Sequence, residues 1–394
     1  MPAPTILVTD PEQRAALAVV RALGLRGWRV ITAGPCAGLA GVSRAVSRHV
    51  ALSPDVAYDT ARLRSAVAEL VRNHGIDTVV PVTDRASRAL LGAEDELGVP
   101  VAGPSREAYE AASNKAGLMT MAAACGIRVP FQHLLATPAS AQSLETGEGW
   151  TVVKPSQSVV EVNGSLVNTK VRYAFGAQAL RHLVASYPAA AYPLLLQERI
   201  VGSGEGVFLM RRGQHTHSVF AHRRLREKPP AGGVSTYRES IGPPSALVAQ
   251  CEALLDRLGY EGVAMVEFKR DMVTGEHVLM EINARLWGSV QLAIDAGIDF
   301  PSALVQSTLG LPITVNQVGR EGVRTVWELG ELDHMWALLR HSPEELQLPP
   351  GETAGFPGVL KALVSRRLSD HPEVFRWNDP IPFVAELSRW VRGR

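Results

Sequence analysis

Cysteine is scarce in this chain. Only three of the 394 residues are cysteines, and Cys36, Cys125 and Cys251 stand far apart with no CxxC pairing. An odd number of isolated cysteines argues against a disulfide framework, a zinc site and an oxidising compartment. We therefore expect three small buried side chains.

Long apolar runs, a basic leader and a large net charge are also missing. No stretch approaches 18 uninterrupted apolar residues, and the first ten residues carry no basic region. Forty lysines and arginines face 39 aspartates and glutamates, which gives a net charge of +1. These absences predict a cytoplasmic protein with no membrane segment and no nucleic-acid partner.

Three familiar site motifs are absent. The chain has no Gly-Lys dipeptide, no GxGxxG after its first apolar run and no GxSxG. This excludes a P-loop, a dinucleotide fingerprint and a serine nucleophile elbow. Any phosphate must therefore be held by side chains.

The N-terminal third alternates between two hydrophobic periods. Strand-like runs at 5–9, 28–33 and 78–82 are separated by helix-like segments at 12–25 and 61–73. Alternating strands and helices predict an α/β domain with a parallel, doubly wound sheet. Ligands bind beyond the carboxyl ends of such strands, so the loops 9–13 and 83–88, with Asp10, are candidate substrate contacts. Plain helix caps and polar turns explain these loops equally well.

The rest of the chain reads as an α+β region. Short β-type segments between residues 150 and 283 predict a mainly antiparallel sheet. A loop or hairpin is expected at 156–169, and helix and loop from Pro312 onward.

Two of these segments form a predicted hairpin with acidic residues. Period two places Ala264, Val266 and Phe268 on the core face with Val278, Met280 and Ile282, and leaves the acidic residues on the other face. A turn near residue 274 sets Glu267 opposite Glu281, with Asn283 on the same face. Two carboxylates and an amide favour Mg²⁺, with Mn²⁺ as an alternative. A solvated face neutralised by Lys269 or Arg270 is the alternative explanation.

Other polar groups are weaker candidates when taken singly. Lys154 ends an apolar strand and Lys115 lies among small residues, so either can contact phosphate or be a solvated surface lysine. The residues 202–206 read as a flexible glycine-rich link after the strand 194–198. The segment 221–235 is a basic loop whose charge suits an anionic ligand or simply solvent.

In order along the chain, these residues resemble the ATP-grasp superfamily of carboxylate-amine ligases. The similarity covers about residues 1–310, with stand-alone ATP-grasp ligases the most similar and D-aspartate ligases more distant. It rests on the ordered motifs Lys115, Lys154, Gln197-Glu198-Arg199-Ile200, Glu205, Glu267 and Glu281-Ile282-Asn283-Ala284-Arg285.

The resemblance implies a three-part chain: a Rossmann-like domain at 1–112, an ATP-grasp domain at 113–310 with a lid at about 150–200, and a C-terminal helical extension at 311–394. It implies ATP as cofactor, Mg²⁺ or Mn²⁺, small-molecule carboxylate and amine substrates, and a homodimer. The activity implied is amide formation through an acyl phosphate with release of ADP. A non-catalytic ATP-binding module, and capture of the activated acid by something other than an amine, are the alternatives.

The resemblance also assigns roles. Lys115 and Lys154 contact phosphates, the Gln197–Ile200 segment binds adenine, Glu205 holds the ribose, and Glu267, Glu281 and Asn283 hold the metal. Arg285, Lys154, Arg223 and Arg224 are implied at the reacting groups, and Arg226 at the substrate. Apart from the resemblance, the backbone amides of Gly288 and Ser289, near a predicted helix start, are further candidate substrate contacts beside Asp10.

One departure concerns the phosphate flap. The loop after Lys154 has a single glycine, Gly164, where many members have several, so flap contacts from Ser156, Gln157 and Ser158 stay open. The biotin carboxylase branch is less favoured for this reason.

Overall fold

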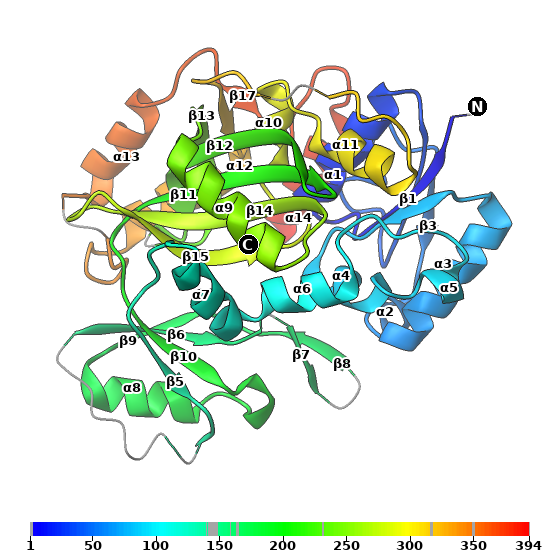
Figure 1. The fold of residues 1–394 in the computed structure, drawn as a ribbon. Helices are drawn as coiled ribbons and strands as arrows, with labels where there is room; N and C mark the ends of the chain where they lie inside the picture. The colour runs from blue at the N-terminus through cyan, green and yellow to red at the C-terminus, as the bar shows by residue number, and fades with distance from the viewer. Residues whose placement is uncertain are drawn as a thin grey trace.

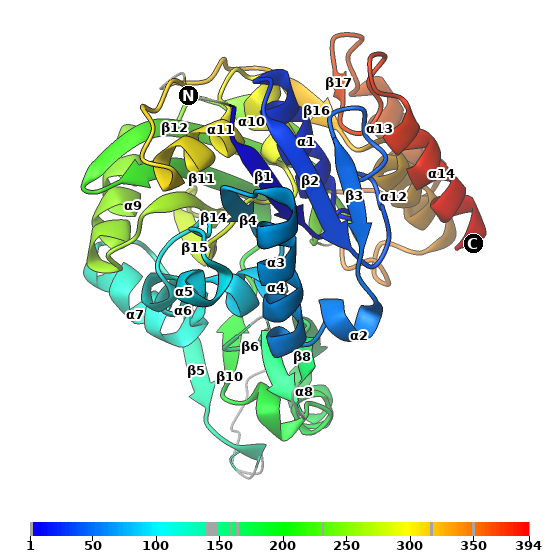
Figure 2. The same cartoon turned by 90° about the vertical axis from the view of Figure 1, so that its right-hand side faces the viewer.

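The computed structural model describes residues 3–138, 140, 149–157, 159–162, 165–230, 232–315, 318–348 and 351–393. Within them the chain forms two larger parts and a separate lid, seen from two sides in Figures 1 and 2. Among the helices described, none combines the length and hydropathy that a membrane crossing requires.

The N-terminal part is a four-stranded parallel sheet in the order β3-β2-β1-β4, which confirms the predicted doubly wound arrangement. All five residues of β1 are buried, as an apolar run covered on both faces requires. The elements are β1 (Thr5–Thr9), α1 (Arg14–Leu25), β2 (Arg29–Gly34), β3 (Arg48–Ala51), α2 (Pro54–Ala57), α3 (Thr60–His74), β4 (Thr78–Val80), α4 (Asp84–Leu90), α5 (Glu94–Leu97), α6 (Arg106–Ser113) and α7 (Lys115–Ala124).

The lid is a small antiparallel sheet that lies below the rest of the molecule in Figure 1. Helix α8 packs against one face of it, around Leu180 and Val184. The hairpin expected in 156–169 is present as β7 and β8. The lid elements are β5 (Gln132–Leu135), β6 (Trp150–Pro155), β7 (Val159–Val162), β8 (Ser165–Asn168), β9 (Arg172–Phe175), α8 (Gly176–Ala185) and β10 (Leu194–Glu198).

The largest sheet has the order β15-β14-β11-β12-β13-β16-β17 and is antiparallel except between its last two strands. This confirms the predicted mainly antiparallel sheet. Its elements are β11 (Gly202–Arg212), β12 (His215–Lys228), β13 (Val234–Ile241), α9 (Ser245–Arg257), β14 (Gly262–Asp271), β15 (His277–Asn283), α10 (Val290–Asp295), α11 (Phe300–Thr308), β16 (Arg324–Val326), α12 (Glu328–Arg340), α13 (Gly355–Val364), β17 (His371–Pro372) and α14 (Ile381–Arg392).

One buried core joins the N-terminal part to this sheet. Ile6 and Val8 of β1 and the apolar face of α1 pack in the same cluster as Phe208, Met265 and Trp287. Because this packing is continuous, the loops that follow β1 and β4 are fixed against the edge of the large sheet.

Four local expectations were wrong. The residues 202–206 are not a flexible link but the start of β11, where a Cβ at Gly204 would lie 2.8 Å from Cδ of Arg224. The basic segment from 221 is not a loop but the end of the long strand β12. The chain after residue 311 also adds two strands, β16 and β17, to the sheet. Of the cysteines only Cys251 is buried, and Cys36 is exposed.

Candidate active site

The predicted hairpin is formed by β14 and β15, and Glu267 lies directly opposite Glu281 in its register. A β-bulge follows, because the next pair is Phe268 with Leu279, and Met280 has no partner residue on β14. The bulge moves Leu279 into the core in place of the predicted Met280, whose sulfur instead lies 3.9 Å from Nζ of Lys154.

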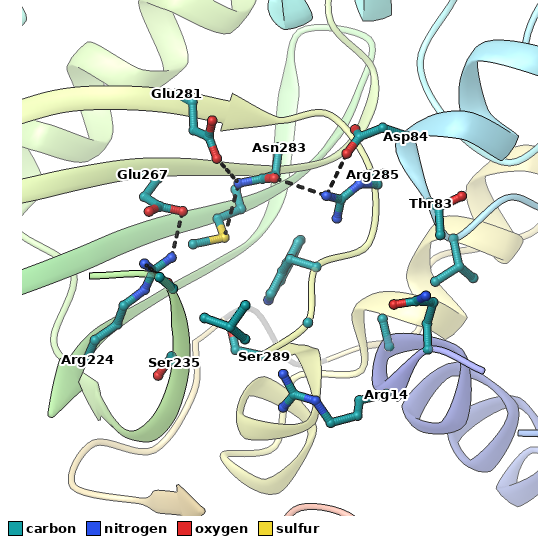
Figure 3. Close-up of a pocket in the computed structure, with 18 of the residues that line it drawn as sticks. Arg14, Thr83, Asp84, Arg224, Ser235, Glu267, Glu281, Asn283, Arg285 and Ser289 are labelled. Atoms are coloured by element: carbon teal, nitrogen blue, oxygen red, sulfur yellow. Dashed lines mark hydrogen bonds and ion pairs between the residues drawn. The ribbon is translucent and has the colours of Figure 1, made fainter. Parts of the chain in front are cut away.

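A cavity of about 660 Å³ lies between this hairpin and the N-terminal loops. Glu267, Glu281, Asn283 and Arg285 form one wall, and Arg14 at the start of α1 lies across from them (Figure 3). Side chains from distant parts of the chain therefore meet at one place.

The acidic groups of this wall are held by cations. Arg224 Nη2 lies 2.6 Å from Glu267, and Lys115 Nζ lies 3.7 Å from Glu281. Burial raises the pKa of Glu267, with Glu281 adding to the rise, although Arg224 opposes it. The cation at Glu267 is thus Arg224, and not Lys269 or Arg270 as the alternative explanation required.

Arg285 is fixed from two sides. Its Nη2 donates to Asp84 at 2.8 Å and approaches the Asn283 side-chain oxygen at 3.4 Å. These bonds hold its guanidinium beside the two carboxylates, where it can meet a transferring phosphoryl group.

The lid brings Lys154 to the same region. By strand alternation and register, Lys154 and Leu195 share one face with Val152 and Gln197. Burial lowers the pKa of Lys154 to about 8.

The same lid face can accept a purine base. Gln197 is 2% exposed, and its side-chain oxygen has no hydrogen-bond partner among the described residues. Apolar Val152 and Leu195 beside an unsatisfied amide oxygen fit a flat base with an amino donor. Ile200 is also buried next to this segment.

The residues present also fit a hard divalent cation. Glu267, Glu281 and Asn283 offer oxygen donors on one face of the hairpin. No group of three His, Cys, Asp or Glu side chains is close enough to hold a metal in the described part of the chain, so such a site has two carboxylates and one amide.

Several predicted site residues lie elsewhere. Glu205 is bonded to Nε2 of His277 at 2.8 Å and shares the face of β11 that carries the core residues Val207 and Leu209. Glu198 accepts the Phe131 amide, and Arg199 donates to the carbonyl of Gln347.

The three arginines of β12 point in different directions. Only Arg224 lines the cavity at the hairpin. Arg223 pairs with Glu239. Arg226 pairs with the buried Glu331 and lines a second cavity of about 470 Å³ against α12 and α13.

The predicted substrate residues divide in the same way. Gly288 and Ser289 line the first cavity. Asp10 does not, because its carboxylate accepts from the Thr9 hydroxyl and the Thr83 amide and so ties the two loops together. Of the flap contacts, Gln157 bonds Arg88 at 2.7 Å, whereas Ser158 and Gly164 lie outside the described residues.

Sequence reasoning missed Arg14 and Arg238, which also line the cavity. Arg238 is fully buried in β13. For Arg238 the available signal was a single arginine within a buried strand. A buried charge needs a partner or a ligand, so such a residue is a candidate for a site.

Known proteins share this architecture. Residues 193–330 match the family described as ATP-grasp in the biosynthetic pathway with Ter operon. Comparison with curated protein sequences finds no match.

Three solved structures are similar over most of the chain. The L-amino acid ligase from Bacillus licheniformis is 18% identical over 78% of this chain and 74% of its own, with a TM-score of 0.60. An ADP complex of N5-carboxyaminoimidazole ribonucleotide synthetase is 13% identical over 93% and 96%, with a TM-score of 0.63. The biotin carboxylase domain dimer of Hydrogenobacter thermophilus 2-oxoglutarate carboxylase, solved with MgADP and bicarbonate, is 12% identical over 81% and 73%, with a TM-score of 0.62. At sequence identities of 12–18%, the similarity shows a shared fold and nothing more specific.

Proposed function

The chain has the ATP-grasp fold, as the resemblance in its sequence predicted, and from this fold we propose that it is an ATP-dependent ligase joining a carboxylate to an amine. The observation that carries the proposal is the meeting of Glu267, Glu281, Asn283 and Arg285 at one cavity, with two lysines next to its wall. Lys115 lies 3.7 Å from Glu281, and Lys154 lies 3.9 Å from the sulfur of Met280 on the same strand. An amino-acid type of substrate is favoured by the similarity to an L-amino acid ligase.

In the proposed reaction a substrate carboxylate oxygen attacks the γ-phosphorus of ATP and ADP leaves. The amine then attacks the acyl phosphate carbon, phosphate leaves, and the amine nitrogen loses a proton. Mg²⁺ bound by Glu267, Glu281 and Asn283 would neutralise phosphate charge.

The chain's own residues position the substrates and stabilise the charge of the transferring phosphoryl group. Arg285 and Lys154 offset the negative charge of the transferring group, and Arg285 is already oriented by Asp84. Gln197 and its apolar neighbours receive the base. No protein nucleophile is required. A cytoplasmic location and a homodimer stay predictions from the sequence.

The test is ADP release with MgATP over a matrix of carboxylic acids and amines, with products identified by mass spectrometry. We expect release that needs both an acid and an amine, and a product joined by loss of water. MgATP binding by calorimetry without ADP release in any mixture would instead favour a non-catalytic nucleotide-binding module.

A further inference from the structure

The cavity carries more positive than negative side chains. Among the described residues that line it, five are arginines and three are acids. This local excess differs from the chain as a whole, where the charges balance.

The excess of positive side chains lies at the end of the cavity that faces the N-terminal loops. At the hairpin, Arg224 pairs with Glu267 and also with Glu227 outside the lining, and Arg285 pairs with Asp84, so no positive charge is in excess there. Glu281 is compensated by Lys115. Arg14, Arg85 and Arg238 stay outside these pairs.

At the N-terminal end, one carboxylate serves two guanidinium groups. Glu373, which follows β17 and is 3% exposed, pairs with Arg14 at 2.5 Å and also with Arg238. Glu328 and Glu386 lie behind this cluster and are not part of the cavity lining. Two guanidinium groups therefore share a single ion-paired carboxylate at the cavity wall.

Arg85 adds a third guanidinium group to this end of the cavity. Its guanidinium lies 4.4 Å from the ring centre of Tyr58, and no carboxylate lies within ion-pair distance among the residues described. Its buried Nε has no hydrogen-bond partner in the same part of the chain. Arg85 is half-buried, and a guanidinium whose buried donor is unsatisfied favours an anion.

We infer that the acid taken by this cavity carries a second negative group, a carboxylate or a phosphate, in addition to the carboxylate that reacts. The inference rests on the proposed function and names its substrate class. The reacting carboxylate lies toward Arg285 and Asn283, and the second group toward Arg85 and Arg14. A cavity of about 660 Å³ is large enough for a small diacid and an amine.

The test traps the activated acid with hydroxylamine, so that the amine need not be known. Hydroxamate and ADP are measured with MgATP for matched acids: glutamate against glutamine, aspartate against asparagine, and phosphoserine against serine. We expect at least about a tenfold higher kcat/KM for the acid with a second negative group. Whether the carboxylate acids or phosphoserine give the larger increase in kcat/KM shows whether the second negative group is a carboxylate or a phosphate.

The variant to make is Arg85→Gln, because Arg85 has no ion pair whose loss would unfold the protein. It should raise KM for the diacid by about tenfold or more and leave KM for ATP within about twofold, and Arg85→Lys should recover part of the loss. Arg62→Gln is the matched control, since Arg62 is an exposed arginine of the same domain paired with Asp55.

Equal turnover of glutamine and glutamate, or an unchanged preference in Arg85→Gln, would overturn the inference while the ligase function stands. Absence of ADP and hydroxamate with every acid, together with calorimetric binding of diacids that depends on Arg85, would overturn the ligase function while the charge preference stands.

Discussion

Glu281 on β15 lies directly opposite Glu267 on β14, so the sheet presents two carboxylates side by side at the cavity. Like charges at such cross-strand positions destabilise a sheet. Burial and the neighbouring carboxylates raise the pKa of Glu267 against the effect of Arg224. A pair that weakens the fold in this way is typical of a functional site.

Glu281→Gln should separate activity from stability. We expect ADP release to fall by roughly 100-fold or more, because a metal-binding carboxylate is lost. The melting temperature should change little, because the lost repulsion with Glu267 is offset by the lost pairing with the buried Lys115. A coupled ADP assay and thermal unfolding measure the two effects.

Glu205→Gln is the control for that prediction. Glu205 is a glutamate of the same sheet, but it is buried and its carboxylate is bonded to His277 on the other face. It should keep ADP release and KM for ATP within about threefold of wild type. Full activity in Glu281→Gln would refute the metal assignment, and a large rise of KM for ATP in Glu205→Gln would restore the ribose role that the resemblance implies.

Lys154 should give ATP binding a pH dependence. Because burial lowers its pKa to about 8, the ammonium that attracts phosphate is present below that pH and is lost above it. We expect kcat/KM for ATP to fall as pH rises through about 8, since this ratio reports the free enzyme. Lys154→Arg stays charged and should flatten the profile between about pH 7 and pH 9. Parallel profiles for the two proteins would contradict the role of Lys154.

Adjacent arginines of β12 should differ in function. Arg224 lies 2.6 Å from Glu267 inside the cavity, whereas Arg223 is half-exposed and bonded to Glu239 outside it. Arg224→Gln should lower ADP release by roughly 10- to 100-fold, because Glu267 is left without its cation. Arg223→Gln should change it by less than about threefold. Steady-state rates with folding checked by circular dichroism decide the point, and the reverse order would mean that Arg223 turns into the cavity during the reaction.

The hairpin could be predicted from the sequence because local rules determine it. Period two and the position of the turn placed Glu267 opposite Glu281, and the structure has that register. The bulge at Met280 was not predictable from period two, since one extra residue changes which side chains face the core.

The C-terminal part of the long strand β12 was missed for a different reason. A run of arginines followed by prolines and glycines is typical of a solvated loop, and nothing local shows that Arg226 meets Glu331 or that Arg223 meets Glu239. These partners are distant in sequence and become neighbours only in the folded sheet. The same holds for Glu373, whose pairing with Arg14 joins the C-terminal segment to the first helix.

Glu386 on α14 provides a test of stability away from the reacting groups. Its carboxylate accepts from Nε1 of Trp327 at 2.9 Å, and the Trp327 ring lies 3.9 Å below the guanidinium of Arg14. Burial raises the pKa of Glu386 from 4.5 to about 7. The folded protein therefore binds more protons than the unfolded chain between these two pH values, and the stability contributed by this group falls as pH rises through that window.

Glu386→Gln removes the ionisation but keeps an oxygen that can accept from Trp327. We expect the variant to melt a few degrees above wild type at about pH 8, where the wild-type carboxylate is charged, and the difference to shrink toward about pH 5, where both side chains are neutral. Thermal unfolding across this range measures it, with Glu345→Gln on the exposed surface as control. A difference that is constant with pH, or that grows toward acid, would mean that Glu386 is not the protonated group, because only its ionisation links stability to this pH window.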